Sequence, residues 1–358
     1  MKTILDIQPN IMDVFFSKYN YAVFPIKLTL VLVLALFIGC GNEENKSIDL
    51  TTIKVGITDF WGEAAFYVAQ AEGFFEEEGL EVTVFSNSAG KESLKDLYEG
   101  KVDIAHVAEI PVVFALSGLE PHSNNDVSLK IFTGLIYTSN SQKIIARRDH
   151  GINEPQDLNG KKVGLYSETT SEYFFDTFLL EHGLREENIE RVNIDITEHY
   201  KALKNGQVDA VVSWEPYASE ILRKLNENTL KLNSVLGHST LWMATSSETF
   251  IRKHPDTIVK YLRALKKSQD YIQRNREETQ KLIAKNTNTS LEIIRNIWDS
   301  IDYEISIGER MLYLLNQQQR WLVQEEHVDD STKLSEISDA IYLEALEEVY
   351  PEGITVIR

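Results

Sequence analysis

The feature that most constrains the fold of this chain is a segment that occurs twice, 106 residues apart. Residues 100–111 and 206–217 both run from a glycine through Val-Asp into a short apolar stretch that reaches a glutamate. Gly100, Asp103 and Glu109 each have an identical residue 106 positions later. A glycine of this kind ends a helix, and the apolar stretch predicts a short buried strand. The chain is therefore expected to contain two similar structural halves.

The similarity extends upstream, where each half begins with a strand pattern. Lys-Val-Gly followed by an apolar residue occurs at residues 54–57 and 162–165, and apolar runs follow at residues 81–85 and 191–196. Helical patterns separate these runs, so each half alternates between strand and helix. This alternation predicts an α/β fold in which helices cover both faces of a mostly parallel sheet.

Polar and aromatic residues stand at the ends of the repeated strands. Ligands of such sheets bind beyond the carboxyl ends of the strands, and Glu109, Trp214 and Glu215 lie at two such ends. We therefore expect a binding cleft between the two halves. The alternative is that the repeat marks two α/β units that share no site.

Length and charge narrow the class of protein. A chain of 358 residues exceeds what one hydrophobic core usually supports, which predicts two lobes. The formal net charge of −19 would repel the phosphates of nucleic acid, so no nucleic-acid partner is expected.

An apolar run at residues 26–39 predicts an export signal. The run is shorter than the roughly 20 residues that span a bilayer. Cys40, the only cysteine, follows directly, and Leu36–Cys40 resembles a bacterial lipobox with Phe37 where leucine is usual. This pattern predicts cleavage before Cys40, its acylation and an exported, membrane-anchored protein. The alternatives are an ordinary export signal with an incidental cysteine, and a start at Met12 rather than Met1.

The remaining sequence is divided by composition and pattern. We expect a signal peptide over 1–39, a polar tether over 40–51, a lobe I formed by 52–141 and 245–358, and a lobe II formed by 142–244. Two crossings between the lobes, near 141–149 and 236–245, would form a two-stranded hinge.

The C-terminal region is predicted to be helical and to cover lobe I. His254-Pro255 predicts a helix start with proline in the first turn. The pairs Thr289/Glu292 and Ser306/Glu309 have the spacing of capping boxes and predict two further helix starts.

Two stretches that follow strands are suited to ligand contact. Residues 169–171 offer three hydroxyls at a predicted helix start, where free backbone N–H groups attract polar or anionic groups. Plain capping by Thr169, with Glu172 at capping-box spacing, is the alternative. Phe60 and Trp61 form the corresponding aromatic stretch in the first half. Core packing competes there, but the polar turn around Trp61 favours its exposure.

Signals for catalysis are weak. The sequence has no G-x-G-x-x-G after a strand, no P-loop and no H-E-x-x-H, and Ser213 does not lie in a G-x-S-x-G elbow. The eight histidines are scattered without metal-binding spacing. We therefore expect no cofactor and no metal.

Taken together, several segments resemble one family. They are the lipobox leader, V-G-I…G-F-F…G-L-x-V over 55–82, G-x-V-D-I-A over 100–105, G-x-V-D-A-V-V-x-W-E-P over 206–216, and the segment before His254-Pro255. This combination resembles the nitrate/sulfonate/taurine and thiamine-precursor (pyrimidine) solute-binding proteins of ABC importers. The resemblance implies a bilobal, type II-like periplasmic-binding-protein fold, a helical C-terminal extension and a small molecule enclosed between the lobes. It further implies a monomer whose partners are an ABC permease and its ATPase. The cysteine-rich signature of the related eukaryotic pyrimidine synthases is absent, which argues against an enzyme.

By position, the resemblance places ligand contacts in the loops that follow the strands. The expected ligand-binding residues are Asp59, Trp61, Glu63, Ser86, Asn87, Glu109, Tyr137, Thr138, Ser167, Glu168, Thr169, Thr170, Ser171, Trp214 and Glu215.

Five of these residues are carboxylates, and Lys91 is the only cation that the sequence places near them. Their charge favours a neutral or cationic ligand such as a pyrimidine over nitrate or a sulfonate. The alternative of an anionic ligand held by the helix start at 169–171 stays open. Two other classes also stay open: an enzyme that uses His106, Glu109 or Glu215 for acid–base chemistry, and a ligand-sensing domain for a membrane partner.

Overall fold

The computed structural model describes residues 50–119, 127–234, 238–328 and 334–357. The predicted signal peptide and Cys40 lie outside these residues, as does nearly all of the predicted tether. The chain divides into two units, Met1–Ile48 and Asp49–Arg358, and the described residues belong to the second. Among the described residues, no helix is long and apolar enough to cross a membrane.

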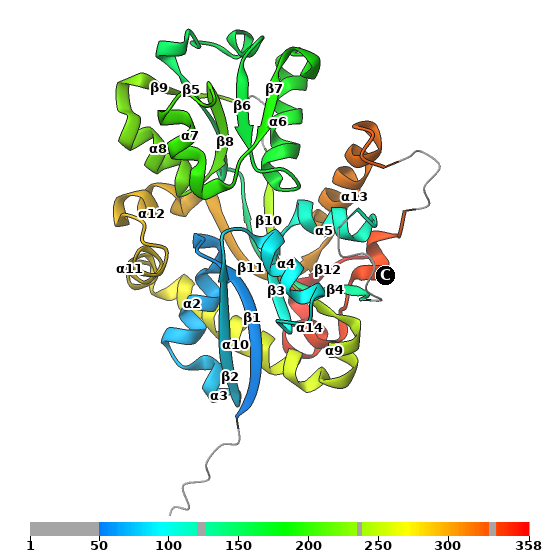
Figure 1. Ribbon diagram of the computed structural model, residues 1–358. Coiled ribbons are helices and arrows are strands. Elements are labelled where there is room, and N and C mark those ends of the chain that lie inside the picture. Colours follow the sequence, from blue (N-terminus) through cyan, green and yellow to red (C-terminus); the bar gives the residue numbers. More distant parts are fainter. Residues whose placement is uncertain (1–49, 120–126, 235–237, 329–333, 358) are drawn as a thin grey trace, which may run out of the picture. The chain divides into compact units, whose positions relative to one another are not determined.

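A seven-stranded sheet forms the centre of lobe I, the name used here for this sheet and the helices packed on it (Figure 1). Its strands, in spatial order, are β12 (Ile354–Thr355), β11 (Ile301–Gly308), β4 (Leu129–Thr138), β10 (Thr240–Ser247), β3 (Ile104–Ala108), β1 (Thr51–Thr58) and β2 (Leu80–Asn87). β1 pairs in parallel with β2 and β3, whereas β10 lies antiparallel to both β3 and β4.

A five-stranded sheet forms the centre of lobe II. Its strands, in spatial order, are β7 (Glu190–Asn193), β6 (Lys162–Leu165), β8 (Ala210–Trp214), β5 (Gln142–Arg147) and β9 (Thr229–Leu232). β6 is parallel to β7 and β8, and β5 is antiparallel to β8 and β9. The predicted α/β class with two sheets is confirmed, but the prediction of mostly parallel sheets is wrong, because β10, β4 and β11 in one sheet and β5 and β9 in the other are joined by antiparallel pairs.

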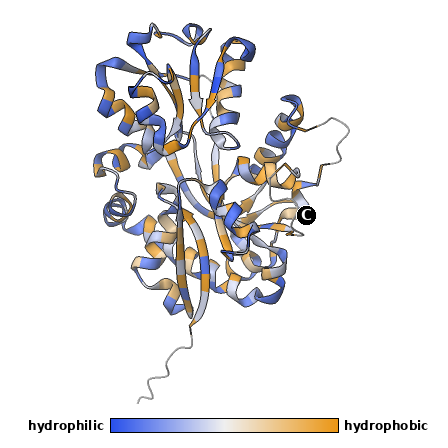
Figure 2. Cartoon of the chain, in the orientation of Figure 1, coloured by the Kyte–Doolittle hydropathy of each residue, from blue (hydrophilic) through white to orange (hydrophobic). Residues whose placement is uncertain are grey.

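Helices cover both sheets. Lobe I carries α2 (Ala64–Ala71), α3 (Phe74–Glu77), α4 (Gly90–Tyr98), α5 (Glu109–Leu116), α9 (Glu248–Lys253), α10 (Pro255–Arg274), α11 (Arg276–Asn286), α12 (Leu291–Ile297), α13 (Glu309–Gln324) and α14 (Glu344–Val349). Lobe II carries α6 (Thr170–Glu181), α7 (His199–Lys204) and α8 (Tyr217–Leu225). Short 3-10 turns lie at Trp61–Glu63, Arg148–His150, Pro155–Leu158, Glu186–Asn188, Ile196–Glu198, Asn226–Asn228, Trp298–Ser300, Ile337–Ala340 and Pro351–Gly353. In Figure 2 the strands carry many hydrophobic residues, whereas the outer helix α11 is mostly hydrophilic.

The sequence repeat corresponds to a repeated structural element. Asp103 accepts a hydrogen bond at Oδ2 from the backbone N–H of Lys54, 2.8 Å away, and Asp209 accepts the same bond from Lys162 at 2.8 Å. Gly100 and Gly206 have φ angles of +70° and +69°, a left-handed conformation that glycine adopts at no steric cost. In each lobe the aspartate therefore fixes the first strand against the start of the strand that follows the glycine.

The chain crosses twice between the sheets. β4 ends at Thr138 and β5 begins at Gln142, while β9 ends at Leu232 and β10 begins at Thr240. All of β10 pairs with β3 and β4, so a boundary after residue 244 would divide a strand of the seven-stranded sheet. The crossings therefore occupy 139–141 and 233–239.

The C-terminal helices begin close to their predicted starts, but two predicted caps are wrong. α10 begins at Pro255, as expected, and α12 is capped by Ser290, whose side chain accepts from the N–H of Ile293, rather than by Thr289. α13 begins at Glu309, but Ser306 belongs to β11, where it is paired with β4 and cannot turn into a cap. The predicted packing of these helices on lobe I is confirmed by the contacts of α10 with α2 and of α13 with α5.

Candidate ligand-binding site

A pocket lined by residues of both lobes lies between them. Its walls come from the strand ends and helix starts of both sheets. Lobe I contributes Thr58, Asp59, Phe60, Ser88, Ala89, Gly90, Lys91, Ala108, Pro111, Thr240 and Trp242; the first crossing and lobe II contribute Ser141, Gln142, Thr169, Thr170, Trp214 and Tyr217. The repeated strand ends therefore meet at one pocket.

Each lobe contributes a pair of aromatic side chains to the pocket. The rings of Phe60 and Trp242 in lobe I are 5.1 Å apart between centroids and tilted by 56°. Trp214 and Tyr217 in lobe II are 6.5 Å apart and nearly perpendicular. Aromatic faces on both walls suit a flat ring, because stacked and edge contacts each stabilise it.

The start of α6 forms the polar part of the lobe II wall. Thr169 is the N-cap, and its Oγ1 accepts from the N–H of Ser171 at 3.3 Å, which confirms the predicted capping by this residue. The full capping box is wrong, because the carboxylate of Glu172 accepts from the N–H of Glu168 instead. Thr170 lines the pocket, and its buried hydroxyl has no hydrogen-bond partner among the described residues.

Contacts between α4 and lobe II bridge the two lobes beside the pocket. The ammonium of Lys91 lies 2.9 Å from the carbonyl oxygen of Ser167 and 3.7 Å from the carboxylate of Glu168. The hydroxyl of Tyr166 donates to Glu92, and burial together with this carboxylate raises the pKa of the phenol. The lobes are therefore joined by direct polar contacts beside the pocket.

Only one of the five predicted carboxylates lines the pocket. Asp59 is exposed at the wall and accepts from the hydroxyl of Ser86 at 2.8 Å. Glu63 lies in the core of lobe I, where it contacts His106 and the indole N–H of Trp242. Glu168 faces Lys91. The predicted charge of the cleft was therefore too negative.

The two glutamates of the repeat make bonds at or next to the chain crossings. Glu109 accepts at Oε2 from the N–H of Leu241 at 3.0 Å, where the second crossing enters β10. Glu215 lies 3.3 Å from the ammonium of Lys143 and donates its backbone N–H to Ser141 in the first crossing. Both glutamates are buried, and burial lowers the pKa of Lys143. Lys91 is thus not the only cation beside the predicted carboxylates, because Lys143 arrives from a distant part of the sequence.

The predicted exposure of Trp61 is wrong. Its side chain is 1 % exposed, and its ring lies 4.3 Å from that of Phe60 between centroids. The 3-10 turn at Trp61–Glu63 folds these side chains inward against the sheet, a direction that the polar sequence around them did not indicate.

The other predicted residues surround the pocket without lining it. Asn87 donates to Ser93 and Asp96, and Tyr137 lies under the guanidinium of Arg310 at 4.1 Å from the ring centroid. Asn140 donates its N–H to the hydroxyl of Thr138 in the first crossing. The remaining residues make these bonds: Ser86 donates to Asp59, Ser167 accepts from Lys91, and Ser171 donates to Gln142.

The pocket residues that were not predicted as ligand contacts include Lys91, Gln142, Thr240 and Trp242. The last two lie on β10, within a segment that was predicted only as the second crossing between the lobes. The face that a strand presents depends on its neighbours, and β10 pairs with strands more than a hundred residues earlier in the chain. The sequence signal that could have identified Trp242 as a pocket residue was a tryptophan in a strand that returns to the first lobe.

Comparison with known proteins places the chain in a family. Residues 62–279 match the family model described as NMT1/THI5 like. The chain belongs to the NMT1/THI5-like family. This confirms the resemblance that the sequence motifs indicated.

Relatives of this NMT1/THI5-like protein include binding proteins and enzymes. It is 23 % identical over 280 residues to a putative aliphatic sulfonates-binding protein of Bacillus subtilis, covering 75 % of this chain and 80 % of that one. It is 26 % identical over 228 residues to the 4-amino-5-hydroxymethyl-2-methylpyrimidine phosphate synthase of Aspergillus parasiticus, covering 58 % and 62 %.

The fold of this NMT1/THI5-like protein is also that of solved structures. It matches the periplasmic aliphatic sulphonate binding protein SsuA from Escherichia coli with a TM-score of 0.65 at 18 % identity, over 84 % of this chain and 98 % of the other. The predicted periplasmic-binding-protein fold is confirmed.

Proposed function

We propose that this protein is an exported solute-binding lipoprotein that encloses a small organic molecule between its lobes and delivers it to an ABC permease and its ATPase. The observation that carries the proposal is the pocket itself, because side chains of both lobes line it and polar contacts join the lobes beside it. A ligand that touches both walls favours the closed arrangement by the difference in its affinity for the two states. The family and the fold agree with this role.

The ligand that we favour is a flat nitrogen-containing ring, such as a pyrimidine precursor of thiamine. The two aromatic pairs offer faces on opposite walls, and Asp59 offers an acceptor for an amino group. No cation among the described residues pairs with Asp59, whereas the ammonium of Lys91 is occupied by Ser167 and Glu168. A donor-rich or cationic ligand would therefore be attracted and a free anion repelled. This argument rests on one carboxylate of the wall rather than on five.

A sulfonate is the second candidate. The unpartnered hydroxyl of Thr170 and the N-terminal end of α6 face the pocket, and helix N-termini attract anions. The name of the Bacillus subtilis relative points in the same direction.

An enzymatic role is less favoured, although one relative is named a synthase. His106, Glu109 and Glu215 were the candidate acid–base groups, and they are absent from the pocket wall. All three are buried and engaged with protein groups. A ligand-sensing role for a membrane partner would use the same pocket, and capture of a permease rather than a receptor would argue against it.

A thermal-shift screen tests the ligand class. We would compare 4-amino-5-hydroxymethyl-2-methylpyrimidine, simple amines, alkanesulfonates, taurine and nitrate. A specific ligand at a hundred times its dissociation constant should raise the free energy of unfolding by about 2.7 kcal/mol. We expect the pyrimidine to stabilise the protein, with a smaller effect in Asp59→Asn and an unchanged effect in Thr170→Val.

The opposite pattern would reject the pyrimidine. Stabilisation by sulfonates alone, lost in Thr170→Val and kept in Asp59→Asn, would assign an anionic ligand. Mass spectrometry of the recovered ligand separates binding from catalysis, because a binding protein returns it chemically unchanged.

A further inference from the structure

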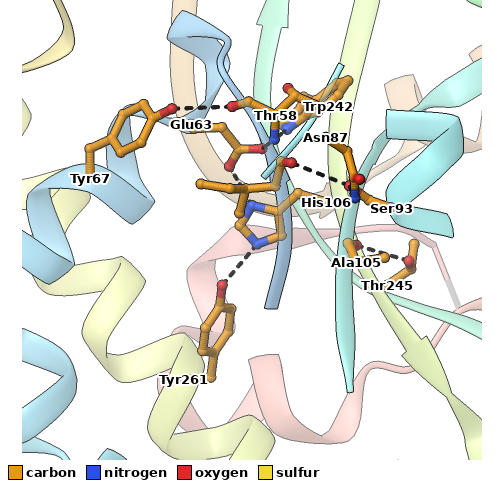
Figure 3. A network of polar contacts seen from close by, with 11 residues as sticks. Thr58, Glu63, Tyr67, Asn87, Ser93, Ala105, His106, Trp242, Thr245 and Tyr261 are labelled. Carbon is orange, nitrogen blue, oxygen red and sulfur yellow. Dashed lines mark hydrogen bonds and ion pairs between the residues drawn. The ribbon is translucent and has the colours of Figure 1, made fainter. Parts of the chain in front are cut away.

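The indole of Trp242 is held from behind the pocket wall by a buried carboxylate. Trp242 lines the pocket from β10, and its Nε1–H donates to Oε1 of Glu63 across 2.9 Å (Figure 3). Glu63 is 1 % exposed and lies in the 3-10 turn before α2. The indole has a single N–H donor, so this bond fixes which edge of the ring points away from the pocket.

Glu63 is itself held by His106, which in turn contacts Tyr261. Its Oε2 lies 2.5 Å from Nδ1 of His106 on β3, and Nε2 of His106 lies 2.9 Å from the hydroxyl of Tyr261 on α10 (Figure 3). Burial raises the pKa of the Tyr261 phenol well above its ordinary value, so the phenol keeps its proton. Glu63, His106 and Tyr261 thus form one buried chain of polar contacts behind the Trp242 indole.

The far edge of the Trp242 ring is bounded as well. A Cβ placed on Gly90, at the start of α4, would lie 2.8 Å from Cη2 of Trp242, which is closer than real Cβ contacts. Phe60 packs against the ring at a tilt of 56°. The indole is thus confined between Glu63 at one edge and Gly90 at the other.

Packing alone does not account for this arrangement. A carboxylate with no exposed surface is costly to bury unless its oxygens are bonded. Glu63 contacts His106 and accepts from the backbone N–H of Thr58 and from the Trp242 indole, and the last bond gives a pocket residue a directed acceptor.

We propose that Glu63 is a positioning residue for ligand recognition, which holds the Trp242 indole in the plane that a flat ligand needs. The proposal rests on the proposed function, because it assumes that the pocket binds a ligand. A ring that is already oriented loses less conformational freedom when the ligand binds, so fixing it raises affinity.

The first test follows the Trp242 indole N–H by NMR in protein labelled with ¹⁵N-tryptophan, with the resonance assigned through Trp242→Phe. We expect Glu63→Leu to move this proton upfield, because its charged acceptor is lost, and Glu63→Gln to produce a smaller shift, because the amide oxygen can still accept. Glu109→Gln is the matched control. It neutralises another buried carboxylate that bonds to β10 but not to the indole, so the resonance should stay in place.

The second test measures the affinity for 4-amino-5-hydroxymethyl-2-methylpyrimidine in a double-mutant cycle. Loss of the charge-assisted bond should weaken binding about tenfold in Glu63→Gln, and the same substitution should have little further effect in a Trp242→Phe background. A purely structural role would lower the thermal midpoint and leave the two effects on affinity additive.

An unchanged indole resonance in both Glu63 variants would overturn the proposal, and so would additive affinity losses. Glu63→Gln keeps the test available if Glu63→Leu does not fold. If the wild-type protein bound no probe, the proposed function would fail while the resonance would still show whether Glu63 orients Trp242.

Discussion

The ammonium of Lys91 in lobe I lies 2.9 Å from the carbonyl oxygen of Ser167 in lobe II. The same ammonium stands 3.8 Å from the centre of the Tyr166 ring. One side chain of α4 thus makes a hydrogen bond and a cation–π contact between the lobes beside the pocket. Protein atoms alone supply part of the free energy that holds the lobes together.

Removing this ammonium should favour separated lobes. We expect Lys91→Met to increase the radius of gyration measured by small-angle X-ray scattering and to speed ligand dissociation about tenfold, because a hydrogen bond from a charged group is lost. Lys95→Met is the control, since Lys95 is exposed on the same helix. Equal scattering curves for Lys91→Met and the wild-type protein would contradict the prediction.

Trp214 should report ligand binding by fluorescence. It lines the pocket at the carboxyl end of β8 and is only partly buried. We expect ligand addition to change the tryptophan emission, and Trp214→Ala to remove most of that change and weaken binding. Trp298→Phe is the control, because Trp298 packs near Tyr303 and is not among the pocket residues. A full fluorescence response with normal affinity in Trp214→Ala would show that the residue does not contact the ligand.

The Lys143–Glu215 pair should be sensitive to the loss of one partner. Both side chains are buried, at 9 % and 2 % exposure. Glu215→Gln leaves a buried ammonium without its counter-charge, and we expect the free energy of unfolding to fall by about 3 kcal/mol. Lys143→Met combined with Glu215→Leu should restore much of this loss, since neither charge remains. Urea unfolding of the three proteins provides the measurement, and equal losses in the single and double variants would argue against a coupled pair.

His199 should make the protein less stable in acid. Burial lowers the pKa of His199 from 6.5 to about 4, and its Nε2 lies 3.1 Å from the carbonyl oxygen of Ile194. Between these two pKa values the unfolded chain binds the proton and the folded chain does not, so stability falls as the pH drops from 6.5 towards 4. The expected contribution is at most about 3 kcal/mol.

Two variants isolate this effect. His199→Gln, which retains a donor, should flatten this part of the stability profile. His254→Gln should leave it unchanged, because His254 is exposed. A profile of His199→Gln that follows the wild-type curve would exclude His199 as the source.

Cys40 should be required for anchoring the protein to the membrane. Cys40→Ser should move the protein from the membrane fraction to the soluble fraction without lowering its thermal midpoint, because polar residues separate Cys40 from β1. Detergent-phase partitioning of the two proteins is the measurement. Unchanged partitioning of the variant would reject the lipobox interpretation.

Much of the fold could be predicted because its signals are local. The glycine, aspartate and apolar strand of the repeat lie within ten residues of one another, and Asp103 and Asp209 make the same bonds in both lobes. The helix start at Thr169 and the aromatic residue at the end of β8 also lie next to the patterns that predicted them, and both reach the pocket.

Local sequence patterns could not predict which way the side chains of the buried carboxylates point. A glutamate at a strand end can face a ligand or the neighbouring chain, and the choice depends on partners that are distant in sequence. Glu215 meets Lys143 from β5, and Glu63 meets Trp242 from β10. No local pattern records such pairs, because they exist only once the two crossings have placed the strands.

The position of β10 also has a consequence for how the protein is made. β10 lies between β3 and β4, although the whole of lobe II separates it from them along the chain. A chain emerging from its N-terminus can complete the five-stranded sheet as soon as Leu232 is available. In the seven-stranded sheet, the edges of β3 and β4 that flank β10 stay unpaired until Ser247 arrives, and the other edge of β4 stays unpaired until Gly308. Open edges of this kind favour aggregation and slow, non-local folding. Lobe I is therefore expected to stay open to non-native pairing for longer than the lobe inserted within it, and a chain truncated before residue 247 is expected to aggregate.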